Sequence, residues 1–233
     1  MATRFGVVKK SRLSDFSNPR KSGIIAVDLD EGDILIGAAI TDGHHDVMLF
    51  SDAGKAVRFD ENDVRPMGRT ARGVKGMNLG EGHEVIAMLV APSELEGVAI
   101  SSDASQVSPS SVLTATQNGY GKRTPIAEYT RHGRGTKGMI AIQTSERNGK
   151  VVAAALVSPE DQIMLITTGG VLVRTRVSEI REMGRSTQGV TLINVDEGTH
   201  LSGLQRIAES DSDDDADELG EESDNLSESS GDA

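Results

Sequence analysis

Cysteine and tryptophan are absent from the 233-residue chain, and the other aromatic residues are scarce, with four phenylalanines and two tyrosines. Without cysteine the chain can form neither a disulfide framework nor a thiolate metal site, and it has no cysteine nucleophile. Its core must be built mainly from Val, Ile, Leu and Met. No apolar run approaches the ~18 residues of a membrane-spanning helix, and the N-terminus does not resemble a signal peptide, so a cytoplasmic location is expected.

Positive charge is missing from one region, the C-terminal tail. Residues 209–233 contain twelve acidic residues and no Lys or Arg, whereas residues 1–208 hold 24 of each sign, so the net charge of −12 belongs to the tail. Such a segment buries too little apolar surface to offset its ordering entropy and is predicted to be disordered. Two roles remain open: a solubilising appendage, or an intramolecular polyanion that competes for a basic surface of the body.

A Gly-rich motif recurs along the body of the chain. The stretch at residues 64–76 is repeated at 180–190 with Met, Gly, Arg, Gly and Val in register, and weaker copies occur at 129–139 and 16–24. Each copy follows two β-rich runs joined by a Gly turn, which is a hairpin signal, and two further apolar runs come after it. Four short strands per unit of about fifty residues is typical of a propeller blade.

The repeats predict an all-β fold of propeller-like blades. We place four blades at approximately residues 1–46, 47–111, 112–162 and 163–208, followed by the acidic tail. The spacing from Gly54 to the next hairpin glycine is 65 residues, against 48 and 51 elsewhere, and the surplus predicts an insertion loop at residues 91–111. The first repeat starts part-way through its opening strand, which suggests a fragment of a longer protein.

Basic residues recur at fixed positions of the repeat. Equivalent positions lie at equivalent places on successive blades, so these cations are predicted to form a ring along one rim that can follow a curved polyanion. The intervening glycines would leave backbone amides open to phosphate oxygens. The alternative is that the bases pair with neighbouring carboxylates in a solvated face. The candidate phosphate-binding residues are Lys10, Arg58, Arg123 and Arg174 in a first column, Lys21, Arg69, Arg134 and Arg185 in a second, and Arg72 and Lys137 in a third, which Gln188 interrupts.

Signals of catalysis are weak. Residues 133–138 satisfy G-x-G-x-x-G, but residues 139–142 are strand-like where a dinucleotide-binding loop requires a helix. The five histidines show no metal-ligand spacing, and there is no G-x-S-x-G elbow. Neither a catalytic residue nor a metal site is predicted.

Several longer runs resemble the C-terminal domain of the DNA gyrase A protein. They are residues 114–124, 47–51, 173–180 and 203–209, the last followed by the acidic tail. The resemblance covers residues 1–209 and implies about four blades of a six-bladed β-pinwheel, a propeller relative with strands exchanged between blades. It further implies that the domain binds and bends double-stranded DNA, so that a type IIA topoisomerase can introduce negative supercoils; the ten basic residues of the three columns are the candidates for this contact.

The resemblance also implies partners: the remainder of gyrase A, together with gyrase B, in a heterotetramer of the bacterial cytoplasm and nucleoid. ATP and Mg²⁺ would be used elsewhere in that holoenzyme, and no cofactor is expected in this chain. Two features of the family lack a match here. The basic Gly-rich heptapeptide of the domain's first blade is missing, and the catalytic tyrosine belongs to the N-terminal part of gyrase A, so neither Tyr120 nor Tyr129 inherits that role.

Two alternatives stay open. A propeller of this kind can serve as a scaffold that binds an acidic protein surface. The chain can also belong to the related topoisomerase IV, although the corresponding domain there usually has more degenerate repeats and lacks so acidic a tail.

Overall fold

The computed structural model describes residues 1–93 and 111–207; the predicted acidic tail and nearly all of the predicted insertion loop lie outside these residues. The described chain forms fifteen β-strands and four short 3-10 helices, and it contains no α-helix. Within it, no helix is long and apolar enough to cross a membrane. The all-β class predicted from the repeats is confirmed.

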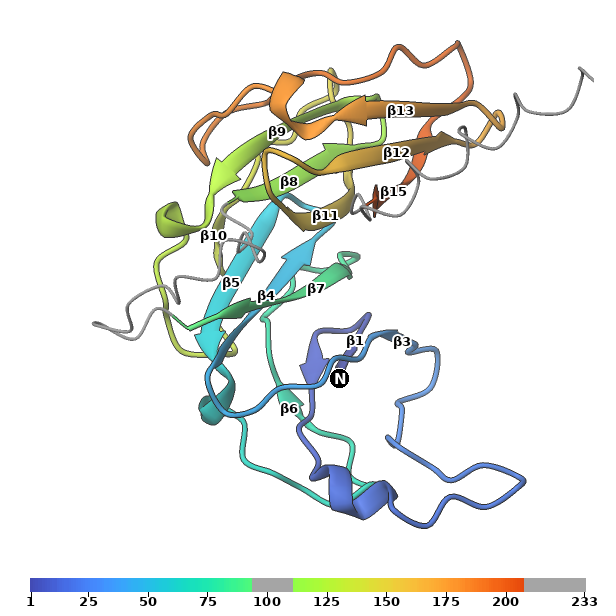
Figure 1. Cartoon of the computed structure of the whole chain (residues 1–233), viewed down its shortest axis with the longest axis vertical. Coiled ribbons are helices and arrows are strands. Elements are labelled where there is room, and N and C mark those ends of the chain that lie inside the picture. The colour runs from blue at the N-terminus through green and yellow to red at the C-terminus, as the bar shows by residue number, and fades with distance from the viewer. Residues whose placement is uncertain (94–110, 208–233) are drawn as a thin grey trace, which may run out of the picture.

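The strands form four antiparallel sheets that follow one another in chain order (Figure 1). The sheets are, strand by strand, β3 (Leu35–Gly37), β1 (Ala2–Thr3), β2 (Val7–Val8) and β6 (Val74–Lys75); β7 (Val85–Pro92), β4 (His45–Ser51), β5 (Lys55–Asp60) and β10 (Met139–Ile140); β11 (Val151–Val157), β8 (Ser111–Thr116), β9 (Tyr120–Pro125) and β14 (Val190–Thr191); and β15 (Leu201–Ile207), β12 (Gln162–Thr167) and β13 (Leu172–Arg176).

The outer strand of each of the first three sheets comes from the following repeat. β6 pairs with β2, β10 with β5, and β14 with β9, all antiparallel. These three strands continue the Gly-rich loops, so each loop crosses from its own repeat onto the preceding sheet. In the described part of the fourth sheet, β13 is an edge strand. This exchange of strands defines a β-pinwheel.

The hairpin glycines make the exchange possible. Gly54 has a φ of +75°, and its carbonyl oxygen accepts hydrogen bonds from the amides of Ala141 at 2.8 Å and Ile142 at 3.2 Å. A Cβ at Gly54 would lie 2.2 Å from the carbonyl oxygen of Ile142, and one at Gly119 would lie 2.1 Å from that of Ile193. Glycine alone tolerates both the positive φ and so close an approach.

The core consists of three apolar clusters, each shared between neighbouring sheets. The first and second sheets share a cluster that includes Leu49 and Phe59. The second and third share one in which the rings of Phe50 and Tyr129 meet edge to face, with centroids 5.8 Å apart. Aliphatic side chains make up most of the three clusters, as the composition predicts, and the aromatic residues in them are Phe50, Phe59 and Tyr129.

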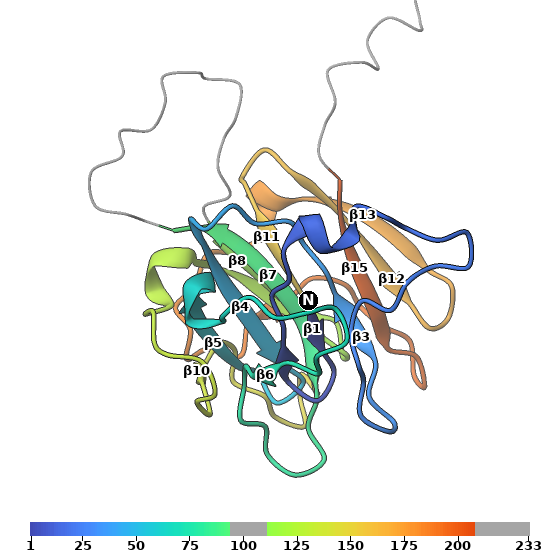
Figure 2. The same ribbon diagram turned by 90° about the horizontal axis from the view of Figure 1, so that it is seen from below.

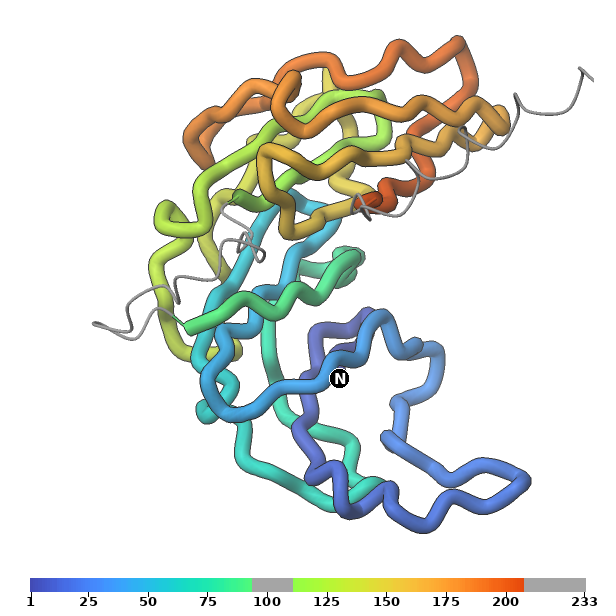
Figure 3. Tube along the Cα trace, in the orientation of Figure 1, coloured from blue at the N-terminus to red at the C-terminus, as the bar shows by residue number. Residues whose placement is uncertain are grey.

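The four sheets lie along an arc, with the first and last sheets at its two ends (Figure 3). Edge strands β3, β7, β11 and β15 contact one another in this order along the arc. The exchanged strands lie on the opposite edges of their sheets. In the view from below, β10 and β5 lie on one side of the second sheet and β7 on the other (Figure 2). The Gly-rich loops therefore lie on the outer side of the arc.

Candidate nucleic-acid interface

The first basic column lies at the junctions between sheets rather than on an open rim. Lys10, Arg58 and Arg123 each reach the short 3-10 helix of the following repeat or the residue that ends it. Their backbone carbonyls accept hydrogen bonds from the next Gly-rich loop as well, at 2.8 Å in all three cases. The helices are η2 (Glu61–Asp63), η3 (Ile126–Glu128) and η4 (Val177–Glu179).

Arg58 shows the inward role most clearly. Its residue exposure is 5%, and its Nε lies 2.7 Å from Oδ2 of the fully buried Asp46. Its Nη1 donates to the carbonyl oxygens of Ile126 and Tyr129, both at 3.1 Å. The prediction that Arg58 stands on an exposed ring is therefore corrected: a guanidinium buried with a carboxylate and two carbonyls joins the second repeat to the third.

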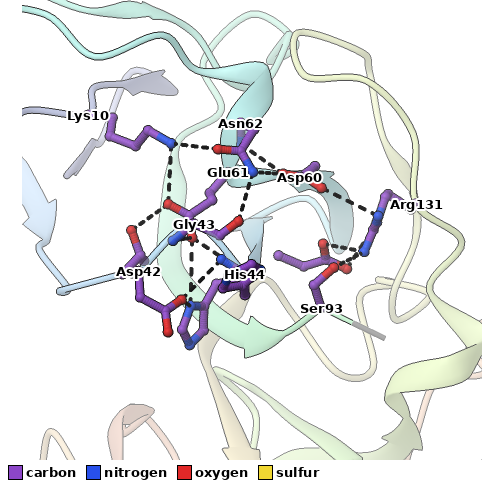
Figure 4. Close-up of polar contacts among 12 residues, drawn as sticks. Lys10, Asp42, Gly43, His44, Asp60, Glu61, Asn62, Ser93 and Arg131 are labelled. Atoms are coloured by element: carbon purple, nitrogen blue, oxygen red, sulfur yellow. Dashed lines mark hydrogen bonds and ion pairs between the residues drawn. The ribbon is translucent and has the colours of Figure 1, made fainter. Parts of the chain in front are cut away.

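Lys10 makes the same connection one repeat earlier (Figure 4). Its Nζ lies 3.3 Å from Oε2 of Glu61, a residue that is 3% exposed. Burial raises the pKa of Glu61, but hydrogen bonds from the Thr41 hydroxyl, the Gly43 amide and Lys10 outweigh it and hold the pKa below its ordinary value. Lys10 thus balances a buried carboxylate. Arg123 is half-buried and donates from Nε to the carbonyl oxygen of Ile180 at 2.7 Å.

Three potential metal ligands meet beside Lys10: Asp42, His45 and Glu61, whose ligand atoms lie within 4.8 Å of one another. The Glu61 carboxylate already accepts hydrogen bonds from Thr41, Lys10 and two backbone amides, and His45 Nδ1 lies 2.9 Å from Asp42 Oδ1. The protein's own cation and donors therefore satisfy this carboxylate, and the cluster supports no metal assignment.

The second column lies on the Gly-rich loops. Each arginine donates from Nη1 to a carbonyl oxygen at or just after the end of the preceding repeat's Gly-rich loop: Arg69 to Ile25 at 2.9 Å, Arg134 to Lys75 at 3.1 Å, and Arg185 to Ile140 at 3.1 Å. Arg134 is exposed, and the other two are half-exposed. The structure therefore places these three equivalent cations at three successive junctions, on the outer side of the arc.

The remaining predicted residues are exposed but less regular. Arg72 pairs with Asp28 at 3.5 Å and with Asp30 at 2.6 Å, as the solvated-face alternative anticipates. Lys21 and Lys137 are exposed on their loops. Arg174 is exposed on the edge strand β13 and donates to Gln162 of the neighbouring strand.

Other cations on the loops fall outside the predicted columns. Arg65 and Arg181 occupy equivalent positions in the two best-matched copies of the Gly-rich motif, and both are exposed. Arg131 bridges Asp46 at 2.8 Å and Asp60 at 3.5 Å (Figure 4). The alignment of the two motif copies contained the signal for the first pair, because both residues follow the opening apolar position directly.

The loop glycines have two different roles. A Cβ at Gly73, Gly138 or Gly189 would lie 2.5 to 2.6 Å from a carbonyl oxygen of the preceding sheet, and all three have positive φ. By contrast, a Cβ at Gly68 or Gly133 would meet nothing within 4 Å. The glycines of the first group are needed for docking onto the neighbouring sheet, and those of the second leave the outer backbone of the loop bare.

These features define the class of protein: a β-pinwheel in which exchanged loops carry arginines at regular intervals along the outer side of an arc. The comparisons place the chain within that class. The family model described as the DNA gyrase C-terminal domain, beta-propeller, matches residues 1–42, 45–92, 110–158 and 161–208. The chain belongs to this family.

Curated relatives carry the name of the A subunit of DNA gyrase. The chain is 51% identical to that of Pseudomonas aeruginosa over 217 residues, which cover 93% of this chain and 22% of the relative. It is 48% identical to that of Escherichia coli over 219 residues, 94% of this chain and 23% of the relative. The chain thus spans about a quarter of the length of these relatives.

Two solved structures have a similar fold. The DNA gyrase A C-terminal domain superposes with a TM-score of 0.73 at 26% identity, over 89% of this chain and 64% of that one. The C-terminal domain of DNA topoisomerase IV superposes with a TM-score of 0.77 at 25% identity, over 88% of this chain and 60% of that one.

Proposed function

We propose that this chain binds duplex DNA through its Gly-rich loops and bends it along the outer side of the arc. The observation that carries the proposal is the equivalent placement of Arg69, Arg134 and Arg185 at three successive junctions. A guanidinium has five N–H donors, and the hydrogen bonds of Arg134 within the described chain involve its Nε and Nη1. The other donors are available to phosphate oxygens while the arginine stays held in place.

Repetition along an arc favours a curved duplex. A straight duplex touches few of the junctions, whereas a bent one meets the arginines in turn. Bending a site of 20 to 30 base pairs costs about 1 to 6 kcal/mol, which additional phosphate contacts can offset. Such contacts carry little sequence information, so binding is expected to be insensitive to sequence and sensitive to salt.

The names of the relatives extend the proposal to a holoenzyme. We propose that the chain supports negative supercoiling by a type IIA topoisomerase, together with the rest of gyrase A and with gyrase B in a heterotetramer, in the bacterial cytoplasm. ATP and Mg²⁺ would act in other parts of that assembly, which would also contain the catalytic tyrosine. In support, Tyr129 is fully buried in the core and burial raises the pKa of its hydroxyl, so it is poorly placed to attack DNA.

Duplex affinity measured against salt tests DNA binding. In the full 233-residue chain, replacing Arg69, Arg134 and Arg185 together by alanine should weaken binding to a random-sequence duplex. If each arginine neutralises one phosphate, the slope of log affinity against log salt should become shallower by about 2.7, since each contact contributes ~0.9.

Arg206→Ala is the control. Arg206 lies on β15, the edge of the fourth sheet opposite the loops, where it pairs with Asp161 at 3.5 Å. Its loss should leave the salt slope unchanged. Unaltered duplex binding by the triple variant would contradict the proposal. Equally tight binding to poly-glutamate, lost in the same variant, would favour the protein-scaffold alternative.

A further inference from the structure

Two buried lysines lie directly beneath Gly-rich loops. Lys9 and Lys122 each precede a member of the first basic column, and they are 3% and 0% exposed. Lys122 Nζ donates to the carbonyl oxygens of Gly184 and Arg185, both at 2.6 Å, and to the Thr187 hydroxyl at 3.1 Å. All three acceptors belong to the loop of the next repeat that carries Arg185.

Lys9 occupies the equivalent place two repeats earlier. Its Nζ donates to the carbonyl oxygen of Ala26 at 2.6 Å and to that of Arg69. Lys9 and Lys122 therefore each hold the backbone carbonyl of a second-column arginine. The contact fixes the main chain from which the guanidinium extends.

The fold itself does not require a lysine at this position. The equivalent residues of the second and fourth repeats are Val57, which is 1% exposed, and Val173. The ion pairs found among the described residues do not include Lys122, and the oxygens that accept its hydrogen bonds are all neutral. Burying a charge in this way costs stability, and a well-packed apolar side chain is often neutral or better.

The burial has a measurable signature. The pKa of Lys122 is lowered to about 8, mainly by burial; the nearby Glu128 carboxylate partly opposes the shift, and the Arg185 guanidinium adds to it. Because the folded-state pKa lies below the unfolded one, folding disfavours the charged form; this destabilisation is full below about pH 8, shrinks as the pH rises further, and is gone only above the ordinary lysine pKa of 10.5. Because the buried Lys122 ammonium destabilises the fold, we expect it to have a role other than stability.

The third Gly-rich loop shows what happens without the lysine. Val57 lies beneath that loop, and a hollow lined by Val57, His132, Gly133, Thr136 and Lys137, among others, opens between the loop and the sheet. Among the described residues, no lysine donates to the carbonyl oxygen of Arg134; the cation beneath this loop is Arg58, which reaches Tyr129 at the start of the loop. The backbone carbonyls of Arg69 and Arg185 are thus held from below by a lysine, whereas that of Arg134 is not.

We propose that Lys122 is a positioning residue for the DNA contact of Arg185, and that Lys9 serves Arg69 in the same way. Each ammonium donates hydrogen bonds to oxygens on the inner side of the loop. These bonds fix the loop and its arginine before DNA binds. Pre-ordering removes part of the conformational entropy that binding otherwise costs. This proposal rests on the proposed DNA binding.

A double-mutant cycle between Lys122 and Arg185 tests it in the 233-residue chain. Lys122→Met should weaken duplex affinity about 2- to 10-fold, the range for one rotamer-rich group left mobile. In the Arg185→Ala background the same change should have almost no effect, because the group being positioned is gone. Lys122→Val, which introduces the residue found at the equivalent positions 57 and 173, is the second variant. It should weaken duplex affinity to the same extent as Lys122→Met. The melting temperature at pH 7 should stay the same or rise.

A pH profile provides a readout that loss of packing would not move. Between pH 7 and 9 the wild-type affinity should fall more steeply than that of Lys122→Met, because Lys122 loses its proton in this range; the charged groups that act on it are Glu128 and Arg185. Parallel pH profiles, or equal losses with and without Arg185, would overturn the proposal. Unchanged affinity of both folded Lys122 variants would also overturn it. If instead the Arg69, Arg134 and Arg185 triple variant binds DNA normally, the proposed function itself fails.

Discussion

The two main columns of basic residues share their charge and period but differ in their surroundings. Arg58 of the first column is buried with a carboxylate and two carbonyls, whereas Arg134 of the second is exposed and held to the protein by two carbonyls. Both stand at the same junction, between the second and third repeats. A regular spacing of cations therefore does not identify a binding surface, because a repeated junction between sheets needs repeated cations too.

The strongest contrast is expected from Arg58→Ala. Removing this guanidinium leaves the fully buried Asp46 with Arg131 as its remaining cation, at 2.8 Å. Breaking a buried pair in this way should lower the free energy of unfolding by about 3 to 5 kcal/mol. Chemical denaturation measures the loss, with Arg134→Ala as the control that should stay close to wild type. Equal stabilities of the two variants would remove the distinction between the columns.

The junction can be weakened through its backbone as well. Gly54 and Gly170 have φ values of +75° and +80°, but a Cβ at Gly54 would collide with the Ile142 carbonyl, while one at Gly170 would meet nothing within 4 Å. Alanine at either position carries about 1 to 2 kcal/mol of left-handed backbone strain. Gly54→Ala should cost clearly more than Gly170→Ala in the free energy of unfolding. Equal costs would mean that loop docking contributes little to the junction.

Arg134→Ala should affect DNA rather than stability. Losing one phosphate contact should make the salt slope shallower by about 0.9 and weaken binding uniformly across duplex sequences. The matched control is Arg206→Ala, which also removes one charge. A loss confined to particular sequences would show that Arg134 reads bases instead of phosphates.

The smallest effect is expected from Arg174→Ala. Arg174 belongs to the first column, yet it is exposed on β13 and donates to Gln162 of its own sheet. Because Arg174 lacks buried partners like those of Arg58 among the described residues, removing it should change the free energy of unfolding by no more than about 0.5 kcal/mol. A loss as large as that of Arg58→Ala would show that column position, rather than burial, determines the structural role.

The repeats were enough to predict the all-β class and the propeller-like units, and the scarcity of aromatic residues was enough to predict the aliphatic core. The Gly54 turn was recognisable because a positive φ limits the choice of residue. Whether each basic side chain points into a junction or out to solvent was not predictable. Lys10, Arg58 and Arg123 look alike in the sequence, and their burial depends on which helix the following repeat brings beside them.

The loop glycines suggest one role in the sequence and have another in the fold. Gly73, Gly138 and Gly189 suggested bare backbone for phosphates, but each allows close docking on the preceding sheet. Lys9 and Lys122 gave no signal because two repeats of four have valine at that position, so the column did not appear basic. Such a clamp is recognisable only when both sides of the junction are known.

Ligase-mediated circularisation of a duplex shorter than the ~150 base-pair persistence length tests most directly whether the second column holds DNA along the arc. The wild-type chain should accelerate ring closure, and the variant with alanine at Arg69, Arg134 and Arg185 should not. If the wild type binds the duplex without accelerating closure, the loops hold DNA but do not bend it, and the account of the arc is contradicted.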